Sequence, residues 1–104
     1  MDRFAALADP SRRRILELLS RGDRSAGAIA GGFEMSAPAV SQHLKALREA
    51  GLVRVTIDRQ RRIYSLDPDG LAAVDAWIGR VRGFWSKRLD ALEAALAQDK
   101  GESR

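Results

Sequence analysis

The chain has 104 residues, of which 45% are hydrophobic, so it can form one small domain with a modest core and is too apolar for a disordered chain. Its 18 Lys and Arg outnumber its 14 Asp and Glu, giving a net charge of +4, and the basic surplus lies in residues 1–66. The lack of cysteine excludes disulfides and thiolate metal sites, and the lack of a long apolar run or an apolar leader predicts a cytoplasmic protein with no membrane partner.

Capping residues, prolines and glycines divide the first half of the chain into four predicted helices. Asp and Ser side chains can accept the free N–H groups of a first helical turn, and proline fits the first helical position. Glycine allows a helix to end. The predicted helices are residues 2–8, a second from Asp9-Pro10 to Gly22, a third from Ser25 to Gly31-Gly32, and a fourth from Ser36 to Gly51.

Residues 53–66 predict a hairpin, and a long helix follows. Apolar Val53, Val55 and Ile57 alternate with polar residues, which is typical of a half-buried strand. Arg59 and Gln60 then form the turn, and residues 61–66 return as the second strand. Asp67-Pro68 starts a helix that we expect to reach about Gln98. The predicted fold is mainly α with a β-hairpin wing between the fourth and fifth helices, that is, a winged helix-turn-helix. It forms one domain over residues 1–98, with 99–104 as a flexible tail.

The predicted helix from Ser36 to Gly51 has the pattern of a DNA-reading helix. Val40, Leu44 and Leu47 share one side, which leaves a mostly polar side free. A slim helix with small and uncharged residues at its start fits the major groove, where Gln42 can form paired hydrogen bonds with adenine. The alternative is an ordinary solvated surface helix. The expected partner is double-stranded DNA, and the expected contacts are Ser36, Pro38, Ala39, Ser41, Gln42, His43, Lys45, Arg59, Arg61 and Arg62.

The hairpin arginines have two interpretations. Arginine binds phosphates and narrow minor grooves, and a protruding hairpin can bring it there. Charges on an exposed strand also prevent aggregation. We favour DNA contact for Arg59 and Arg61 over Arg62, because strand alternation can turn Arg62 elsewhere. His43 is the only histidine and lacks metal-ligand neighbours, so we expect it to bind a phosphate or the fold rather than a metal.

Three ordered segments carry a resemblance to a known family. Residues 4–19, 36–53 and 61–68 together resemble the ArsR family of bacterial transcriptional regulators, over roughly residues 3–97. The resemblance implies DNA reading by the fourth helix and a homodimer formed by the first and last helices. Many relatives have a longer polar side chain at the position of Ala37, so the resemblance does not identify the operator. The metal-sensing relatives use cysteine or histidine ligands that are missing from residues 24–32 and from the last helix, which implies a member without a metal or other cofactor.

An apolar stripe along the last predicted helix independently indicates a dimer. A helix of nearly thirty residues spans about 40 Å, more than a domain of this size can cover. A second copy of the chain is therefore the expected cover. An intramolecular core and an effector pocket lined by Trp77, Phe84 and Trp85 are the alternatives. The expected interface residues are Phe4, Leu7, Leu71, Val74, Ile78, Val81, Trp85, Leu89 and Leu92.

The sequence therefore predicts a homodimeric, sequence-specific transcriptional regulator, acting as a repressor on a palindromic operator. An enzyme is not expected, because the chain has no nucleophile–base pairing and no phosphate-binding glycine loop. The alternative is a winged-helix protein-interaction module whose basic face binds an acidic partner. The operator sequence, the regulated genes and any small-molecule or protein effector stay open.

Overall fold

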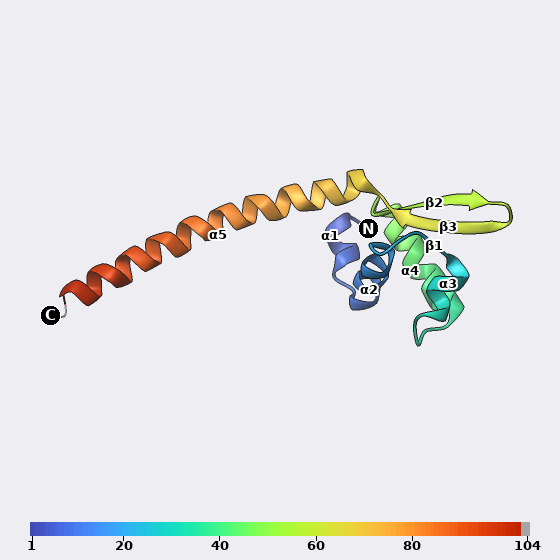
Figure 1. The fold of residues 1–104 in the computed structure, drawn as a ribbon, viewed down its shortest axis with the longest axis horizontal. Helices are drawn as coiled ribbons and strands as arrows, with labels where there is room; N and C mark the ends of the chain where they lie inside the picture. Colours follow the sequence, from blue (N-terminus) through green and yellow to red (C-terminus); the bar gives the residue numbers. More distant parts are fainter. Residues whose placement is uncertain (103–104) are drawn as a thin grey trace. The chain divides into compact units, whose positions relative to one another are not determined.

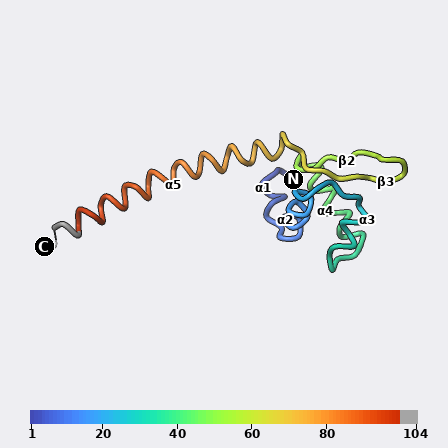
Figure 2. The backbone as a smooth tube through the Cα atoms, in the orientation of Figure 1, coloured from blue at the N-terminus to red at the C-terminus, as the bar shows by residue number. Residues whose placement is uncertain are grey.

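A computed structural model describes residues 1–102 of the chain and the side chains of residues 1–99. The chain divides into two units, the first from Met1 to Val74 and the second beginning at Asp75. Unit 1 holds seven elements and the start of an eighth (Figures 1 and 2). The elements are α1 (Arg3–Leu7), α2 (Pro10–Leu19), β1 (Arg24–Ser25), α3 (Ala26–Gly31), α4 (Ala37–Glu49), β2 (Val53–Asp58), β3 (Arg61–Leu66) and α5 (Pro68–Glu102).

The predicted helix starts are confirmed, because the predicted side chains accept the free N–H groups there. Asp9 Oδ1 accepts from the backbone N–H of Ser11 at 2.7 Å, with Pro10 as the first residue of α2. The Ser25 and Ser36 hydroxyls accept at the starts of α3 and α4, at 3.1 and 3.3 Å. These caps depend on residues only two or three positions away, so the sequence was sufficient to locate them.

The sheet has three antiparallel strands in the order β1-β3-β2. The predicted hairpin is confirmed: Val53 pairs with Leu66 and Asp58 with Arg61, leaving Arg59 and Gln60 as the two-residue turn. β1 was not predicted from the sequence; it pairs Arg24 with Tyr64 at the other edge of β3. The hairpin extends past the helices of unit 1 (Figure 1).

That extension overturns one burial prediction. Val53 is buried and Val55 half-buried, but Ile57 is 74% exposed, so only the base of β2 is half-buried as predicted. The alternation continues beyond the point where helices cover the sheet. The core of unit 1 lies between the helices and the hairpin base and contains Ala6, Ile15, Leu16, Leu19, Ile29, Val40, Leu44, Leu47, Ala50, Leu52, Val53, Tyr64 and Val74.

A glycine joint connects α4 to the hairpin. Gly51 has φ +76°, its N–H donates to the Arg48 carbonyl at 3.0 Å, and the N–H of Leu52 donates to the Leu47 carbonyl at 3.0 Å. These two bonds form a Schellman motif, whose usual apolar contact is supplied by the fully buried Leu47 and Leu52. The chain therefore leaves α4 in a fixed direction and enters β2 directly.

The start of α5 packs against the same joint. A Cβ added to Gly70 would overlap the backbone carbonyl of Gly51, so only glycine fits at this position. The N–H of Asp67 also donates to the Leu52 carbonyl at 2.9 Å. Both ends of the hairpin are therefore held at the C-terminal end of α4.

The last helix is longer than predicted. It reaches Glu102, beyond the predicted end near Gln98. The predicted tail, residues 99–104, overlaps this helix, and residues 103–104 lie outside the described part of the chain. The prediction of one domain over residues 1–98 spans both units and stays a prediction.

We expect Gly70→Ala to lower the free energy of unfolding by about 1–3 kcal/mol, the usual cost of forcing a methyl group into a filled space. Gly31→Ala is the matched control, because Gly31 is also helical and a Cβ there has open space around it. Alanine should be neutral or stabilising at that position. Denaturant unfolding at one fixed protein concentration measures both values, and equal values for the two variants would contradict the packing argument.

Candidate nucleic-acid interface

The core fixes the orientation of α4. Val40, Leu44 and Leu47 are buried against unit 1 as predicted, so the rest of the helix surface is left for other contacts. At 100° per residue, the exposed side chains form two neighbouring strips. We call the first the outward strip, made of Gln42, Lys45 and Glu49, and the second the groove strip, made of Ser41 and Arg48. All five residues are exposed.

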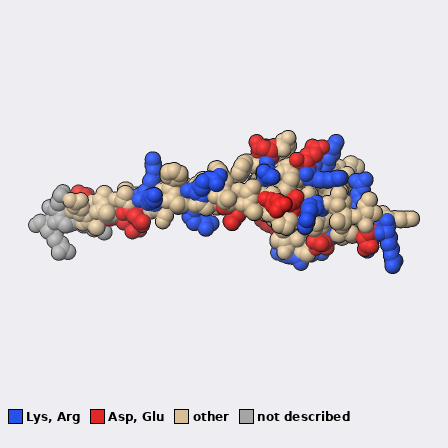
Figure 3. All heavy atoms as spheres, turned by 90° about the horizontal axis from the view of Figure 1, so that it is seen from above, with Lys and Arg blue, Asp and Glu red and all other residues tan. Residues whose placement is uncertain are grey.

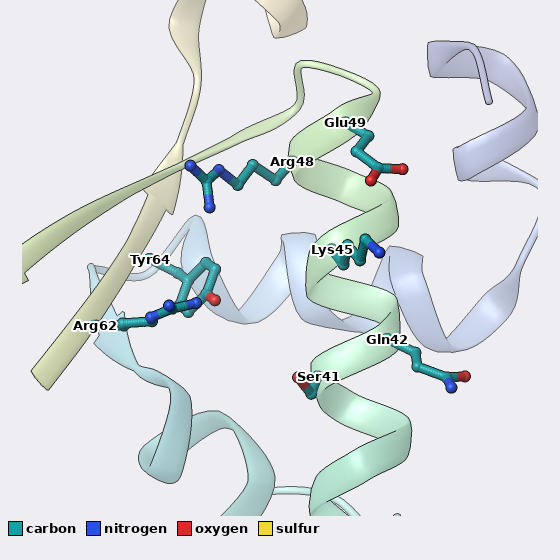
Figure 4. Close-up of a pocket in the computed structure, with 7 residues that line it drawn as sticks. All are labelled: Ser41, Gln42, Lys45, Arg48, Glu49, Arg62 and Tyr64. Atoms are coloured by element: carbon teal, nitrogen blue, oxygen red, sulfur yellow. The ribbon is translucent and has the colours of Figure 1, made fainter.

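A groove separates α4 from β3. It has a volume of about 580 Å³ and is lined by Ser41, Gln42, Lys45, Arg48, Glu49, Arg62 and Tyr64. In Figure 4, Arg48 points from α4 toward the strands, whereas Gln42, Lys45 and Glu49 point to the other side of the helix. A smaller hollow of about 280 Å³, next to α3, shares Ser41, Arg62 and Tyr64 with this groove. The outward strip therefore borders the groove but points away from the strands, whereas Arg48 of the groove strip points toward them.

The start of α4 has the small side chains that the sequence predicted. Ser36 caps the helix, Pro38 is exposed and Ala39 is half-buried. The exposed start of the helix therefore has little bulk, which allows close approach to another surface. The DNA contacts expected from Ser36, Pro38 and Ala39 stay predictions.

His43 lies on the α2 side of α4. It is half-buried, and its charge reaches the Asp9 carboxylate at the start of α2. Burial raises the pKa of Asp9, but hydrogen bonds from the backbone N–H groups of Arg12 and Ser11, together with the charges of His43 and Arg12, hold it below its usual value. Of the two roles weighed for His43, this position favours a contact with the fold.

The two consecutive hairpin arginines lie on opposite faces of the sheet. Arg62 is paired with Ile57 and follows the same face as Tyr64, so it lines the groove beside α4. Arg61 is on the other face, where its guanidinium lies 3.8 Å from the Asp58 carboxylate. Arg62 is therefore the groove-facing residue of the two, and the preference for Arg61 as a DNA contact stays a prediction.

Arg59 stands at the tip in an unusual conformation. Its φ of 60° lies in the left-handed region, where it is the only non-glycine residue in the described part of the chain. Two-residue hairpin turns usually place glycine, asparagine or aspartate at such a position. Figure 3 shows basic side chains protruding at the hairpin end of unit 1. The backbone conformation of Arg59 is therefore strained, and such strained residues cluster at functional sites.

Two of the other arginines have structural roles. Arg12 Nε donates to the Ala6 carbonyl and Arg13 to the Leu7 carbonyl, each at 2.7 Å. These bonds satisfy carbonyls at the C-terminal end of α1, which a short helix leaves free. The arginine run of α2 is therefore used largely to hold α1, and the basic surplus available to a ligand is smaller than the sequence suggests.

The first apolar residues of α5 belong to the core of unit 1. Val74 is buried in the core and Leu71 packs against it, so these two predicted interface residues already have partners in unit 1. Farther along, large apolar side chains are exposed, with Trp85 at 60% and Leu92 at 56%. A hollow of about 270 Å³ is lined by Val81, Phe84, Trp85 and Arg88, so two of the three aromatic residues of the alternative effector pocket contribute to it.

Among the residues that the structure describes, no three His, Asp or Glu side chains are grouped in a way that could hold a metal ion. In the same part of the chain, no helix has the length and apolar character needed to cross a membrane. Three residues of the groove lining were not among the predicted contacts: Arg48, Glu49 and Tyr64. The seven-residue spacing of Ser41 and Arg48, two helical turns, was the available signal for the first.

Comparison with known proteins gives consistent results. Residues 9–55 match the model of the family described as "Bacterial regulatory protein, arsR family". The HTH-type transcriptional regulator Rv2034 of Mycobacterium tuberculosis is 43% identical over 99 residues, which cover 95% of this chain and 89% of that protein. The transcriptional repressor SdpR of Bacillus subtilis is 40% identical, over 72% of this chain and 83% of its own length.

A solved structure also matches. The homodimeric winged helix-turn-helix DNA-binding domain of Mb0332 from Mycobacterium bovis, described as a possible ArsR-family regulator, superposes with a TM-score of 0.63 at 33% identity. The match covers 76% of this chain and 73% of that one. The predicted winged helix-turn-helix fold is confirmed by this likeness together with the observed hairpin and helix order.

Proposed function

Since the chain belongs to the ArsR family of bacterial regulatory proteins, we propose that it is a homodimeric repressor that binds a palindromic operator in duplex DNA. Membership of this family means a transcriptional regulator rather than an enzyme. A regulator of this kind acts in the cytoplasm, where bacterial DNA lies. The observation that carries the proposal is the outward strip of α4, whose polar side chains are exposed beside a basic hairpin.

The outward strip suits the major groove. Gln42 is exposed near the start of α4 and can donate to and accept from adenine at once, whereas Lys45, one turn later, suits a phosphate. The small side chains before it allow the backbone to come close to base edges. The hairpin then supplies charge for the phosphate backbone, which gives most of the affinity but no sequence preference.

The exposed stripe of α5 supports the dimer. Isolated helices are marginal in water unless an apolar face is covered, and here that face carries aromatic and leucine side chains. A second copy would cover it and would also supply a second α4. Two reading helices related by a two-fold axis fit a palindrome whose half-sites are about 34 Å apart.

Selection of random duplex DNA by the full chain, followed by sequencing, tests the proposal as a whole. We expect enrichment of a palindrome with half-sites one helical turn apart. Retention without enrichment would reduce the protein to a non-specific DNA binder. If the chain retains no duplex but binds acidic proteins, the alternative function, a protein-interaction module, would replace the proposed one.

Gln42→Ala should reduce discrimination at one base pair of each half-site by about 1–3 kcal/mol, because a paired hydrogen bond to one base is lost. Gln98→Ala is the control, since it removes the same side chain from an exposed position late in α5. Binding is measured on a set of single-base operator variants. A uniform loss over all variants would show that Gln42 does not read a base.

Arg59→Gly should raise the free energy of unfolding by up to about 1 kcal/mol, because glycine adopts a φ of 60° without the strain that arginine has there. The same variant should weaken all duplexes alike and flatten the salt dependence of binding by about one unit. Gln60→Gly is the control: its φ is not in the left-handed region, so it should gain no stability. A variant that gains stability and keeps full affinity would remove Arg59 from the interface.

Leu89→Glu should convert the dimer to a monomer in sedimentation analysis and weaken operator binding more than tenfold, because an exposed apolar residue of the stripe becomes charged. Ala94→Glu is the matched control, with the same change of charge at an exposed position on the opposite side of α5. If both variants stay dimeric, the stripe around Leu89 is not the interface.

A further inference from the structure

Two guanidinium groups face the α4–β3 groove from opposite walls. Arg48 belongs to the groove strip of α4, and Arg62 belongs to the face of β3 that carries Tyr64 (Figure 4). Within the residues that the structure describes, neither side chain takes part in a hydrogen bond or ion pair. Each therefore has its full set of donors available to a ligand.

This freedom distinguishes them from the arginines nearby. Arg12 and Arg13 donate to carbonyls of α1, and Arg61 is paired with Asp58. The one carboxylate in the groove lining, that of Glu49, points to the other side of α4 in Figure 4. Two like charges that share a groove without a carboxylate between them favour an anion with several acceptor oxygens.

The rest of the lining suits a phosphate. Ser41 lies on the same strip as Arg48, and its hydroxyl can donate to a phosphate oxygen. Tyr64 is only 7% exposed, so its ring is fixed in the core while its polar end lines the groove. The wall that carries Arg62 is therefore held in place before any ligand arrives.

We infer that this groove holds one phosphodiester strand of the operator, bound by Arg48 on one side and by Arg62 on the other. The inference rests on the proposed function and assigns phosphate contacts within it. If the outward strip faces base edges, the backbone that borders the major groove must pass beside that strip. The neighbouring strip of α4 is the groove strip. The hairpin then lies on the far side of the same backbone, with Arg62 facing it and Arg61 facing away.

Arg54 gives a matched control on the other face of the same hairpin, because it pairs with Ser65 and is not among the expected DNA contacts. Arg62→Ala and Arg54→Ala remove the same charge from exposed positions of the hairpin, so long-range effects on DNA are similar and only local contacts differ. Affinity is measured from low to moderate salt on the selected operator and on a scrambled duplex of equal length. Arg62→Ala and Arg48→Ala should each weaken both duplexes by a similar factor, about tenfold, and flatten the salt slope by about one unit. Arg54→Ala should leave the slope within error of the wild type.

A double variant and a lysine variant test whether both guanidinium groups bind the same phosphodiester strand. If both guanidiniums bind one strand, Arg48→Ala combined with Arg62→Ala should lose less than the product of the single losses. Arg62→Lys should keep the salt slope but lose affinity, because lysine keeps the charge and lacks the planar pair of donors. Unchanged unfolding transitions show that each variant is folded.

The outcomes distinguish a failure of the groove assignment from a failure of the proposed function. If the wild type binds its operator and Arg54→Ala flattens the slope while Arg62→Ala does not, DNA lies on the opposite face of the hairpin and the groove assignment is wrong. Full slopes for both Arg48→Ala and Arg62→Ala would also overturn it, with the proposed function intact. A wild type that retains no duplex overturns both.

Discussion

The joint at Gly51 is the constraint on which the interface depends. Its positive φ allows the two hydrogen bonds that end α4, and the chain enters β2 two residues later, at Val53. Gly70 packs against the Gly51 carbonyl, so the returning strand is held at the same point. Both ends of the hairpin are therefore fixed by backbone contacts to one end of α4, the helix that forms the groove with β3. A side chain at either glycine would change the space available between the helix and the hairpin.

The elements set by local chemistry were predictable from the sequence. Asp9-Pro10, Ser25 and Ser36 each act on neighbours within three residues, and the alternation of residues 53–58 found the strand even without a typical turn sequence. The features that were missed depend on distant partners. The two residues of β1 show no period of their own and are a strand only because β3 lies beside them. Ile57 continues the alternation of apolar residues that predicts burial. Its burial depends on whether helices cover that part of the sheet, and the alternation carries no information on this. Only part of the groove lining was predicted from the sequence. Arg48 and Tyr64 come from α4 and β3, which tertiary structure brings together.

The arginines show why composition is a weak guide to a binding surface. Side chains of one type hold α1 in place, pair with a carboxylate, occupy a strained turn or stay free in a groove. The nearest partner determines which of these roles an arginine has. Arg61 and Arg62 differ in role because successive residues of a strand point to opposite faces of the sheet. A guanidinium without a partner, beside another guanidinium, attracts an anion strongly because its N–H donors are free. A guanidinium already bonded to a carbonyl or a carboxylate has fewer donors left for a ligand. The free arginines, rather than all of them, define the charge that a phosphate strand would meet.

The apolar stripe of α5 links stability to function. The part of unit 2 that the structure describes is a single helix, and its exposed aromatic and leucine side chains are costly to leave in water. A second copy of the chain, as the proposed function requires, would remove that cost and place two α4 helices on one complex. Binding at the first half-site would then make the second an intramolecular event, so affinity would depend on the dimer as strongly as on any base contact. Because the same stripe would hold the dimer, a change on α5 far from the DNA would act on operator affinity through the fraction of chains that are paired.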